Sequence, residues 1–296
     1  MQKLKNTVID HMLEACLTKS EVVFLIHISH YQDNSGRITG LYYKDICKAL
    51  DISFQTFYDV RRSLEDKQLI RVDKEYYGDW DITILGNSFE DGKYDEGYIS
   101  TGDDIFFDPD FNKLKAGEIL LVLLLLKITK NKKNGGKYRI GVLIFQEKYC
   151  KLLNVTIRIL QRYLHTLKRF FSVGISKGQY FIRPLKGVGE KIQAPTDIQL
   201  FKEHIGAVMF RRQRASGTKE EYQDTIDLIS QYADTLMDKI TEVFQQAVEE
   251  SIRLKNAGIA NRYKWNRQLN PKFIHKLLLD KIMKLQNFQK KSGKSC

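Results

Sequence analysis

The stretch CKALDIS at residues 47–53 decides the fold, because a closely similar stretch, CKLLNVT, recurs at residues 150–156. The two copies lie 103 residues apart, and apolar residues match beyond them: Phe54, Phe57, Leu64 and Ile70 correspond to Ile157, Leu160, Leu167 and Val173. An internal repeat defines the unit of architecture. In each copy the pattern predicts a helix, a tight turn and a second helix, an arrangement that many proteins insert into a DNA groove.

Elements of the same kind surround both predicted helix pairs. In the first copy we expect helices at 3–17 and about 20–31, the second opened by the capping sequence Thr18-Lys19-Ser20-Glu21, then helices at 42–50 and 54–67 and a β-hairpin over 69–85. In the second copy we expect a helix at 115–129, a strand at 138–142, helices at 144–153 and 156–171, and a hairpin over 173–182 with Lys177-Gly178 at its tip.

These elements predict a mainly α fold with small β-hairpin wings. We expect two tandem winged-helix domains at 1–88 and 105–186, a linker at 89–104, and a helical C-terminal region at 187–296 that ends in a basic tail.

The C-terminal region is expected to contain helices at about 195–210, 220–255 and 271–289. Within 220–255 apolar residues recur every seven positions, with further apolar residues between them: Ile226, Ala233, Ile240, Ala247 and Leu254, then Ile229, Leu236 and Val243. This spacing fits either an oligomer-forming coiled coil or a helix folded against its two neighbours. We expect a homodimer through these helices, because symmetric dimers commonly bind repeated half-sites.

The net charge of +12 is distributed unevenly. Residues 1–90 hold 11 Lys and Arg against 14 Asp and Glu, whereas residues 101–190 hold 17 against 7 and residues 191–296 hold 19 against 12. A basic second copy and C-terminal region indicate a polyanionic partner, contacted mainly by that part of the chain.

Other features exclude several classes of protein. The four cysteines (16, 47, 150 and 296) form no CxxC pair, and Cys47 and Cys150 occupy equivalent apolar positions, which indicates buried thiols in a reducing compartment. The longest apolar run, residues 119–126, is far shorter than the roughly 20 residues that span a bilayer. The sequence also lacks the apolar segment of a secretory signal. We therefore expect a cytoplasmic protein without a membrane partner.

Residues with catalytic or metal-binding chemistry are scattered. His27 and His30 lie three positions apart, but no acidic residue completes a metal set. The tripeptide Gly293-Lys294-Ser295 lacks the first glycine, the strand and the helix of a phosphate-binding loop. An acidic set fits either a bound cation or a linker that caps a helix: Asp103, Asp104, Asp108 and Asp110. We expect no enzymatic activity, no cofactor and no metal.

The second helix of each pair carries side chains suited to DNA. If helix 54–67 buries Phe57, Val60, Leu64 and the edge of Phe54, its outer face presents Gln55, Thr56, Tyr58, Asp59 and Arg62. If the second copy buries Ile157, Leu160, Leu164 and Leu167, its outer face presents Arg158, Gln161, Arg162, His165 and Arg169. Arginine pairs with guanine and glutamine with adenine through two hydrogen bonds each, and Thr and Tyr contact bases or phosphates.

Further basic residues suit the DNA backbone. Lys132 and Lys133 of the basic loop at 130–137, and Lys177 at the hairpin tip, are suited to phosphate contacts, which position a protein without reading sequence. The RRQR run at 211–214 fits either a minor-groove contact or a flexible connector.

Residues 43–72 with the hairpin at 76–85, and residues 145–173 with the hairpin at 174–182, resemble the winged helix-turn-helix superfamily. Among tandem winged-helix proteins the arrangement is similar to plasmid or phage replication initiators, in which two such domains grip repeated origin sites. It is also similar to bacterial transcription regulators with a helical oligomerisation tail. The resemblance implies binding to double-stranded DNA on the nucleoid or a plasmid, with helix 156–171, and also helix 54–67, in successive major grooves.

Three functions stay open at this point. We expect sequence-specific DNA binding in transcription regulation, with replication initiation at origin repeats as the first alternative. The second alternative is a protein-interaction module without DNA binding, because this fold also serves as a packing module. The first copy makes this alternative relevant, since Asp59, Glu65 and Asp66 lie near its expected contact face.

Overall fold

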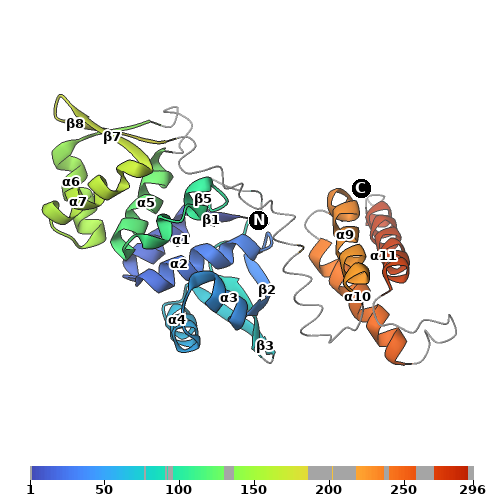
Figure 1. Ribbon diagram of the computed structural model, residues 1–296. Coiled ribbons are helices and arrows are strands. Elements are labelled where there is room, and N and C mark those ends of the chain that lie inside the picture. The colour runs from blue at the N-terminus through green and yellow to red at the C-terminus, as the bar shows by residue number, and fades with distance from the viewer. Residues whose placement is uncertain are drawn as a thin grey trace. The chain divides into compact units, whose positions relative to one another are not determined.

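The computed structural model describes residues 2–76, 78–90, 92, 96–129, 137–185, 202, 218–236, 240–257 and 270–292. The chain divides into two compact units, Met1–Pro195 and Thr196–Cys296. The fold is mainly helical, and the first unit also contains small antiparallel sheets (Figure 1). Among the described residues, no helix has both the length and the apolar character needed to cross a membrane.

The first repeat follows a short strand and helix, β1 (Lys3–Lys5) and α1 (Asn6–Glu14), which replace the single helix expected over 3–17. Its elements are α2 (Lys19–Ile28), β2 (Arg37–Tyr42), α3 (Tyr43–Leu50), α4 (Phe54–Asp66), β3 (Ile70–Tyr76) and β4 (Asp79–Ile84). The capping box predicted at the start of α2 is confirmed. Thr18 Oγ1 accepts a hydrogen bond from the Glu21 N–H, and the Glu21 carboxylate accepts one from the Thr18 N–H.

The second repeat has the same order of elements: α5 (Ala116–Thr129), β6 (Tyr138–Gly141), α6 (Val142–Leu153), α7 (Ile157–Thr166), β7 (Phe171–Ser176) and β8 (Gln179–Pro184). In both antiparallel sheets the last strand lies in the middle, so the strand orders are β2-β4-β3 and β6-β8-β7. The sequence repeat is therefore a repeat of structure. The helix expected over 156–171 ends earlier, because a 3-10 turn at Leu167–Arg169 leads directly into β7.

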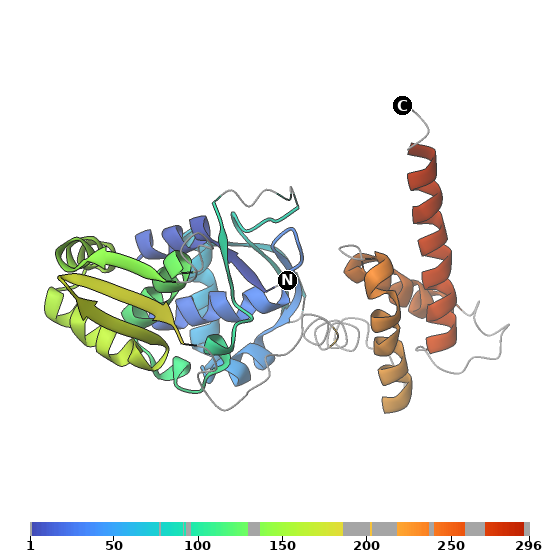
Figure 2. The ribbon, with the colours of Figure 1, turned by 90° about the horizontal axis from the view of Figure 1, so that it is seen from above.

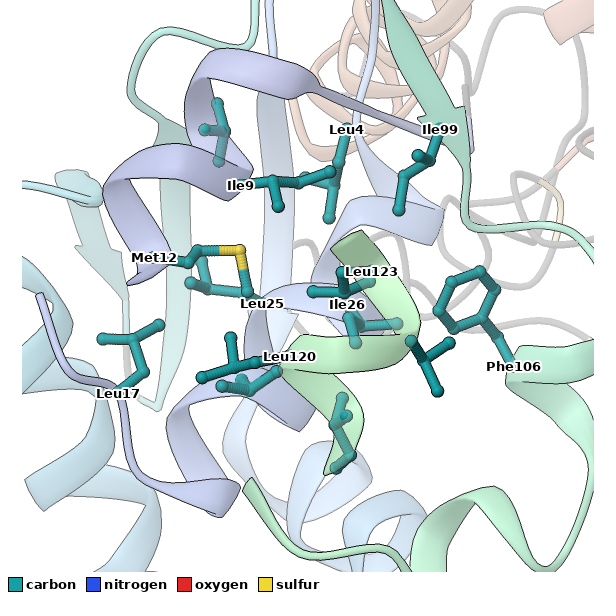
Figure 3. Packing of buried hydrophobic residues seen from close by; sticks show 14 of the residues in the cluster. Leu4, Ile9, Met12, Leu17, Leu25, Ile26, Ile99, Phe106, Leu120 and Leu123 are labelled. Carbon is teal, nitrogen blue, oxygen red and sulfur yellow. The ribbon is translucent and has the colours of Figure 1, made fainter. Parts of the chain in front are cut away.

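One hydrophobic core joins the two repeats. At its centre lies α5, which contacts both α1 and α2, and every residue from 119 to 126 is buried. Figure 3 shows Met12 of α1 and Leu25 of α2 beside Leu120 and Leu123 of α5. A helix covered on every side needs no polar face, and this explains the uninterrupted apolar run.

The segment expected to be a linker, 89–104, is instead part of this core. It contains β5 (Tyr98–Ser100), which pairs antiparallel with β1 (Lys3–Lys5). Leu4 and Ile99 face each other across this pair, and both are fully buried. Buried apolar residues such as Phe89 and Ile99 thus stand in a stretch whose average composition is rich in glycine and acidic residues, so composition is a poor guide to its packing. Two short 3-10 helices continue the chain toward α5: η2 (Asp104–Phe107) and η3 (Phe111–Lys113).

Glu21 connects α2 to α4. Its buried carboxylate accepts hydrogen bonds from the hydroxyl of Ser63 and, at 2.6 Å, from Nζ of Lys67. Burial on its own raises the pKa of this carboxyl, but the hydrogen bonds from Lys67, Ser63 and Thr18 outweigh that effect and hold the pKa below its usual value. A charged Glu21 therefore holds the C-terminal half of α4 on α2.

His27 of α2 makes the stability of the first unit sensitive to acid. Its ring lies against the rings of Tyr31, with 5.4 Å between centroids, and His30, with 6.0 Å. Burial, assisted by the nearby His30, lowers the pKa of His27 to about 3. An unfolded histidine titrates near pH 6.5, so as the pH falls below that value the unfolded chain binds a proton that the folded chain does not, and stability decreases.

We expect His27 to remove about 2 kcal/mol from the free energy of unfolding between about pH 7 and about pH 5. Urea unfolding of the full chain at both pH values measures this loss. The His27→Gln variant cannot titrate at this position, so its loss should be smaller than that of the wild type by the same amount. Equal losses in the two proteins would assign the acid sensitivity to other groups.

The second unit contains α9 (Lys219–Leu236), α10 (Ile240–Asn256) and α11 (Pro271–Ser292), and each contacts the other two (Figures 1 and 2). The single helix expected over 220–255 is thus two helices. Of the heptad residues whose side chains the structure describes, Ile226, Val243 and Ala247 are buried inside this bundle beside Ile274 and Leu278 of α11. This packing agrees with the folded alternative rather than with an extended coiled coil.

The helix expected at about 195–210 lies outside the described residues, except for Lys202. This side chain forms an ion pair with Asp227 of α9 at 3.2 Å.

Candidate nucleic-acid interface

The turn between the two helices has the same geometry in both repeats. Asp51 and Asn154 occupy equivalent positions and adopt left-handed backbone conformations, with φ of 51° and 50°. Among residues other than glycine, Asp and Asn adopt this conformation most readily. In each turn the N–H of the following residue donates a hydrogen bond of 3.0 Å to a cysteine carbonyl: Ile52 donates to Cys47, and Val155 donates to Cys150. The repeated sequence therefore encodes one type of turn.

The second helix of each pair begins with a hydroxyl cap. Ser53 Oγ accepts a hydrogen bond from the Thr56 N–H at 3.0 Å, and Thr156 Oγ1 accepts one from the Ile159 N–H at 3.4 Å. Because the turn and the cap are the same, residues of α4 and α7 that lie 103 positions apart are structurally equivalent.

Each hairpin tip is fixed against the first helix of the pair. The Gly78 carbonyl accepts a hydrogen bond from the Tyr43 N–H at 3.2 Å, and the Gly178 carbonyl accepts one from the Val142 N–H at 2.9 Å. Gly78 has a φ of 88°, and a Cβ atom there would lie 2.8 Å from the ring of Tyr43, so this position requires glycine. Lys177 is exposed at the other tip, as predicted.

The outer face of α7 carries the predicted polar side chains. Arg158, Gln161, Arg162 and His165 are all exposed, while Leu160 and Leu164 are buried, as expected. Positions 158 and 162, and positions 161 and 165, are each one helical turn apart, so the four side chains share one face. On its other side, α7 packs against α5: the ring of Tyr163 lies on Gly117 of α5. A Cβ atom at position 117 would lie only 2.6 Å from that ring, so this close packing requires glycine.

Ile157 departs from the prediction, because its side chain is 51% exposed rather than buried. It is the first residue of α7, and the apolar contacts of that helix begin one turn later at Leu160. Phe54, the equivalent residue of the first repeat, is 54% exposed for the same reason, although its ring also lies against Tyr43, with 5.2 Å between centroids.

The sequence interpretation missed two basic residues of this surface, Lys148 and Lys151 of α6, which are both exposed. The signal was available, because both are charged residues in an amphipathic helix whose apolar residues Phe145 and Tyr149 are buried, and the ammonium of Lys148 lies over the ring of Tyr149, 5.7 Å from its centroid. Glu147 is the one exposed acidic residue of α6 and α7.

Arg169 has a different environment from the other predicted residues. Its guanidinium forms an ion pair with Asp110 and lies 3.7 Å from Asp108. Asp110 also accepts a hydrogen bond from Lys113. These carboxylates compensate the charge of Arg169, which makes this residue less suited to phosphate than its neighbours. In the described part of the chain, no group of three or more His, Cys, Asp or Glu side chains is arranged to hold a metal ion.

The outer face of α4 differs in charge from that of α7. Gln55, Tyr58 and Arg62 are exposed as predicted, and Thr56 is half-buried. Gln55 donates a hydrogen bond to the carboxylate of Asp59 at 2.8 Å. Gln55 and Asp59 are the structural equivalents of Arg158 and Arg162, so the first repeat has an acidic and amide pair where the second has two arginines.

Aromatic side chains surround this part of α4. The rings of Phe54 and Tyr58 both pack on Tyr43, and Tyr58 also lies against the buried Trp80, with 5.7 Å between centroids. The helix pair α3–α4 therefore exposes aromatic rings with balanced charges: Lys44, Lys48 and Arg62 against Asp45, Asp59 and Asp66. The pair α6–α7 exposes four cations against one acidic residue, together with several apolar side chains.

Lys132 and Lys133, with most of their loop, and the arginine-rich run at 211–214 lie outside the described residues. No family model, no curated protein and no solved structure matches this chain.

Proposed function

We propose that this protein binds double-stranded DNA sequence-specifically, with α7 as the helix that enters the major groove. The observation that carries the proposal is the outer face of α7, where Arg158, Arg162, Gln161 and His165 are exposed together on a helix fixed by its cap and by α5. Such side chains near the start of a helix suit hydrogen bonding to base edges.

The charge of the surrounding surface supports the same proposal. Helices α6 and α7 expose four cationic side chains, Lys148, Lys151, Arg158 and Arg162, against the single acidic residue Glu147. A surface of this kind attracts the phosphate backbone from either side of the groove, and Lys177 at the hairpin tip adds a further cation.

The order of elements supports a tandem winged-helix architecture, which we also propose. Each repeat runs helix, strand, two helices and a two-stranded hairpin, with the first strand pairing with the last. In this interpretation the hairpins β3–β4 and β7–β8 are the wings.

For the first repeat, a protein contact is the better-supported candidate. Its α4 face combines exposed Asp59 and Asp66 with the aromatic rings of Phe54 and Tyr58. Carboxylates repel phosphates, whereas aromatic side chains are enriched at protein interfaces. A homodimer through the C-terminal helices, the other expected assembly, would use the exposed side of α11, where Leu279 and Met283 lie one turn apart.

The genomic position of the DNA sites that the protein binds would distinguish transcription regulation from replication initiation. Sites upstream of genes would make the protein a transcription regulator, the role that we favour, and direct repeats beside its own gene would make it a replication initiator.

The test is binding of the full chain to duplexes selected from a random pool, followed by fluorescence anisotropy at several salt concentrations. With six or more phosphate contacts, we expect affinity to fall about 10³-fold or more between about 50 mM and about 200 mM salt. Selected duplexes should bind more tightly than random ones at every salt concentration. Absence of duplex binding near physiological salt would leave the protein-interaction alternative.

A further inference from the structure

Ile157 is an exposed aliphatic side chain in a face that is otherwise polar. It is the first residue of α7, and it lies one turn before Gln161 and two turns before His165, with Arg158 and Arg162 on one side of this row and the buried Leu160 and Leu164 on the other. About half of its surface is open to solvent, at 51%. Leaving a large aliphatic side chain in water forgoes the stabilisation of burial, so a ligand that covers it gains that stabilisation.

We infer that Ile157 contacts the 5-methyl group of a thymine, as part of an A·T pair whose adenine is bound by Gln161. The inference rests on the proposed DNA binding by α7. In the major groove an A·T pair presents the adenine N7 and N6 groups on one side and the thymine methyl group on the other. Glutamine matches the adenine with two hydrogen bonds, and an aliphatic side chain matches the methyl group.

The surrounding charge favours a nucleic acid over a protein as the occupant. Arg158 directly follows Ile157 on α7, Arg162 lies one turn beyond Arg158, and Lys148 and Lys151 are exposed on α6. The helix pair α6–α7 also exposes the apolar side chains of Leu143, Ile144 and Leu152, all of them on α6, so Ile157 is the exposed aliphatic residue of the helix that carries both arginines. An aliphatic side chain on such a cationic helix fits an apolar group that projects from a polyanion, and the thymine methyl is the one apolar group on the major-groove edge of the bases.

The spacing on the helix also predicts the composition of the bound site. The two arginines suit guanine, so we expect the A·T pair contacted by Ile157 and Gln161 to lie next to a G·C pair. In the first repeat, Phe54 occupies the position equivalent to Ile157, but Asp59 stands where the second repeat has Arg162. The charge argument therefore applies to Ile157 alone.

The experiment uses deoxyuridine, which differs from thymidine only by the missing methyl group. In a duplex selected by the full chain, each thymine is replaced in turn by uracil, and affinity is measured for the wild type and for Ile157→Ala. We expect one replacement to weaken wild-type binding about fourfold, the value of one buried methyl-sized group. The same replacement should leave the affinity of Ile157→Ala unchanged.

The matched control is Ile175→Ala. Ile175 is also an exposed isoleucine, but it lies on β7 of the hairpin rather than on α7, so this variant should keep the wild-type response to uracil. If no thymine replacement weakens the wild type, or if Ile157→Ala still responds, the inference is overturned while DNA binding stands. If no duplex is selected at all, the proposed function fails and the inference fails with it.

Discussion

Replacing Arg158 and Arg162 together by alanine is expected to weaken binding to a selected duplex about 100-fold or more. Each arginine that pairs with a guanine through two hydrogen bonds contributes roughly 1–3 kcal/mol of discrimination between bases. Binding to random duplex should weaken much less, because it depends on the number of cations near the phosphates rather than on base contacts. Anisotropy titrations with both kinds of DNA, at one stated salt concentration, measure the difference.

The chain provides a matched control at the equivalent positions of its first repeat. The variant with Gln55→Ala and Asp59→Ala changes the same two positions of α4, and we expect it to leave specific binding nearly unchanged. Both double variants replace exposed side chains, so their thermal stability should stay close to that of the wild type. Equal weakening of specific and random binding by the arginine variant would show that the two arginines contact phosphates rather than bases.

Replacing Glu21 by alanine is expected to produce the largest loss of stability. The change removes the carboxylate half of the capping box of α2, while Thr18 remains as the N-cap, and it leaves the Lys67 ammonium without the carboxylate that it contacts at 2.6 Å. Removing one partner of a buried ion pair is strongly destabilising, so we expect a loss of about 3 kcal/mol. For a unit of this size that corresponds to a decrease in melting temperature of roughly 6–12 °C, measurable by calorimetry of the full chain.

The second repeat again supplies the comparison. Glu118 occupies the same place in α5, and its carboxylate accepts a hydrogen bond from the Lys115 N–H at 2.8 Å. Alanine at this position removes that hydrogen bond to the backbone, which contributes about 1 kcal/mol. Glu21→Ala should also speed amide hydrogen exchange in α4 more than in α7, because Glu21 holds α4 through Ser63 and Lys67. Equal losses for the two glutamate variants would mean that the contact with α4 adds no stability.

The repeat was the most reliable guide that the sequence offered. The repeated stretches 47–53 and 150–156 predicted two tight turns, Thr18-Lys19-Ser20-Glu21 predicted a capping box, and the apolar spacing of α4 predicted the burial of Phe57, Val60 and Leu64, all of which the structure confirms. These features depend on residues within a few positions of one another, so the order of residues is enough to predict them.

The expectations that differ from the structure concern contacts between distant segments. Pairing of β1 with β5 brings Leu4 to Ile99, and at three residues each strand is too short for its pattern to predict a strand. Periodicity along α7 also placed Ile157 in the core, but the position of the core boundary depends on how α5 and α7 pack.

Sequence alone determined the duplicated helix-turn-helix, the two hairpins and the exposed polar set of α7, because short-range periodicity and turn-forming residues specify each of them. Only the tertiary structure decided that the two copies share one core around α5, that Arg169 is paired with Asp108 and Asp110, and that Ile157 is exposed. These outcomes depend on which surfaces meet when distant segments pack. Apolar side chains from all parts of the chain are buried together, and no local sequence pattern specifies which of them come into contact.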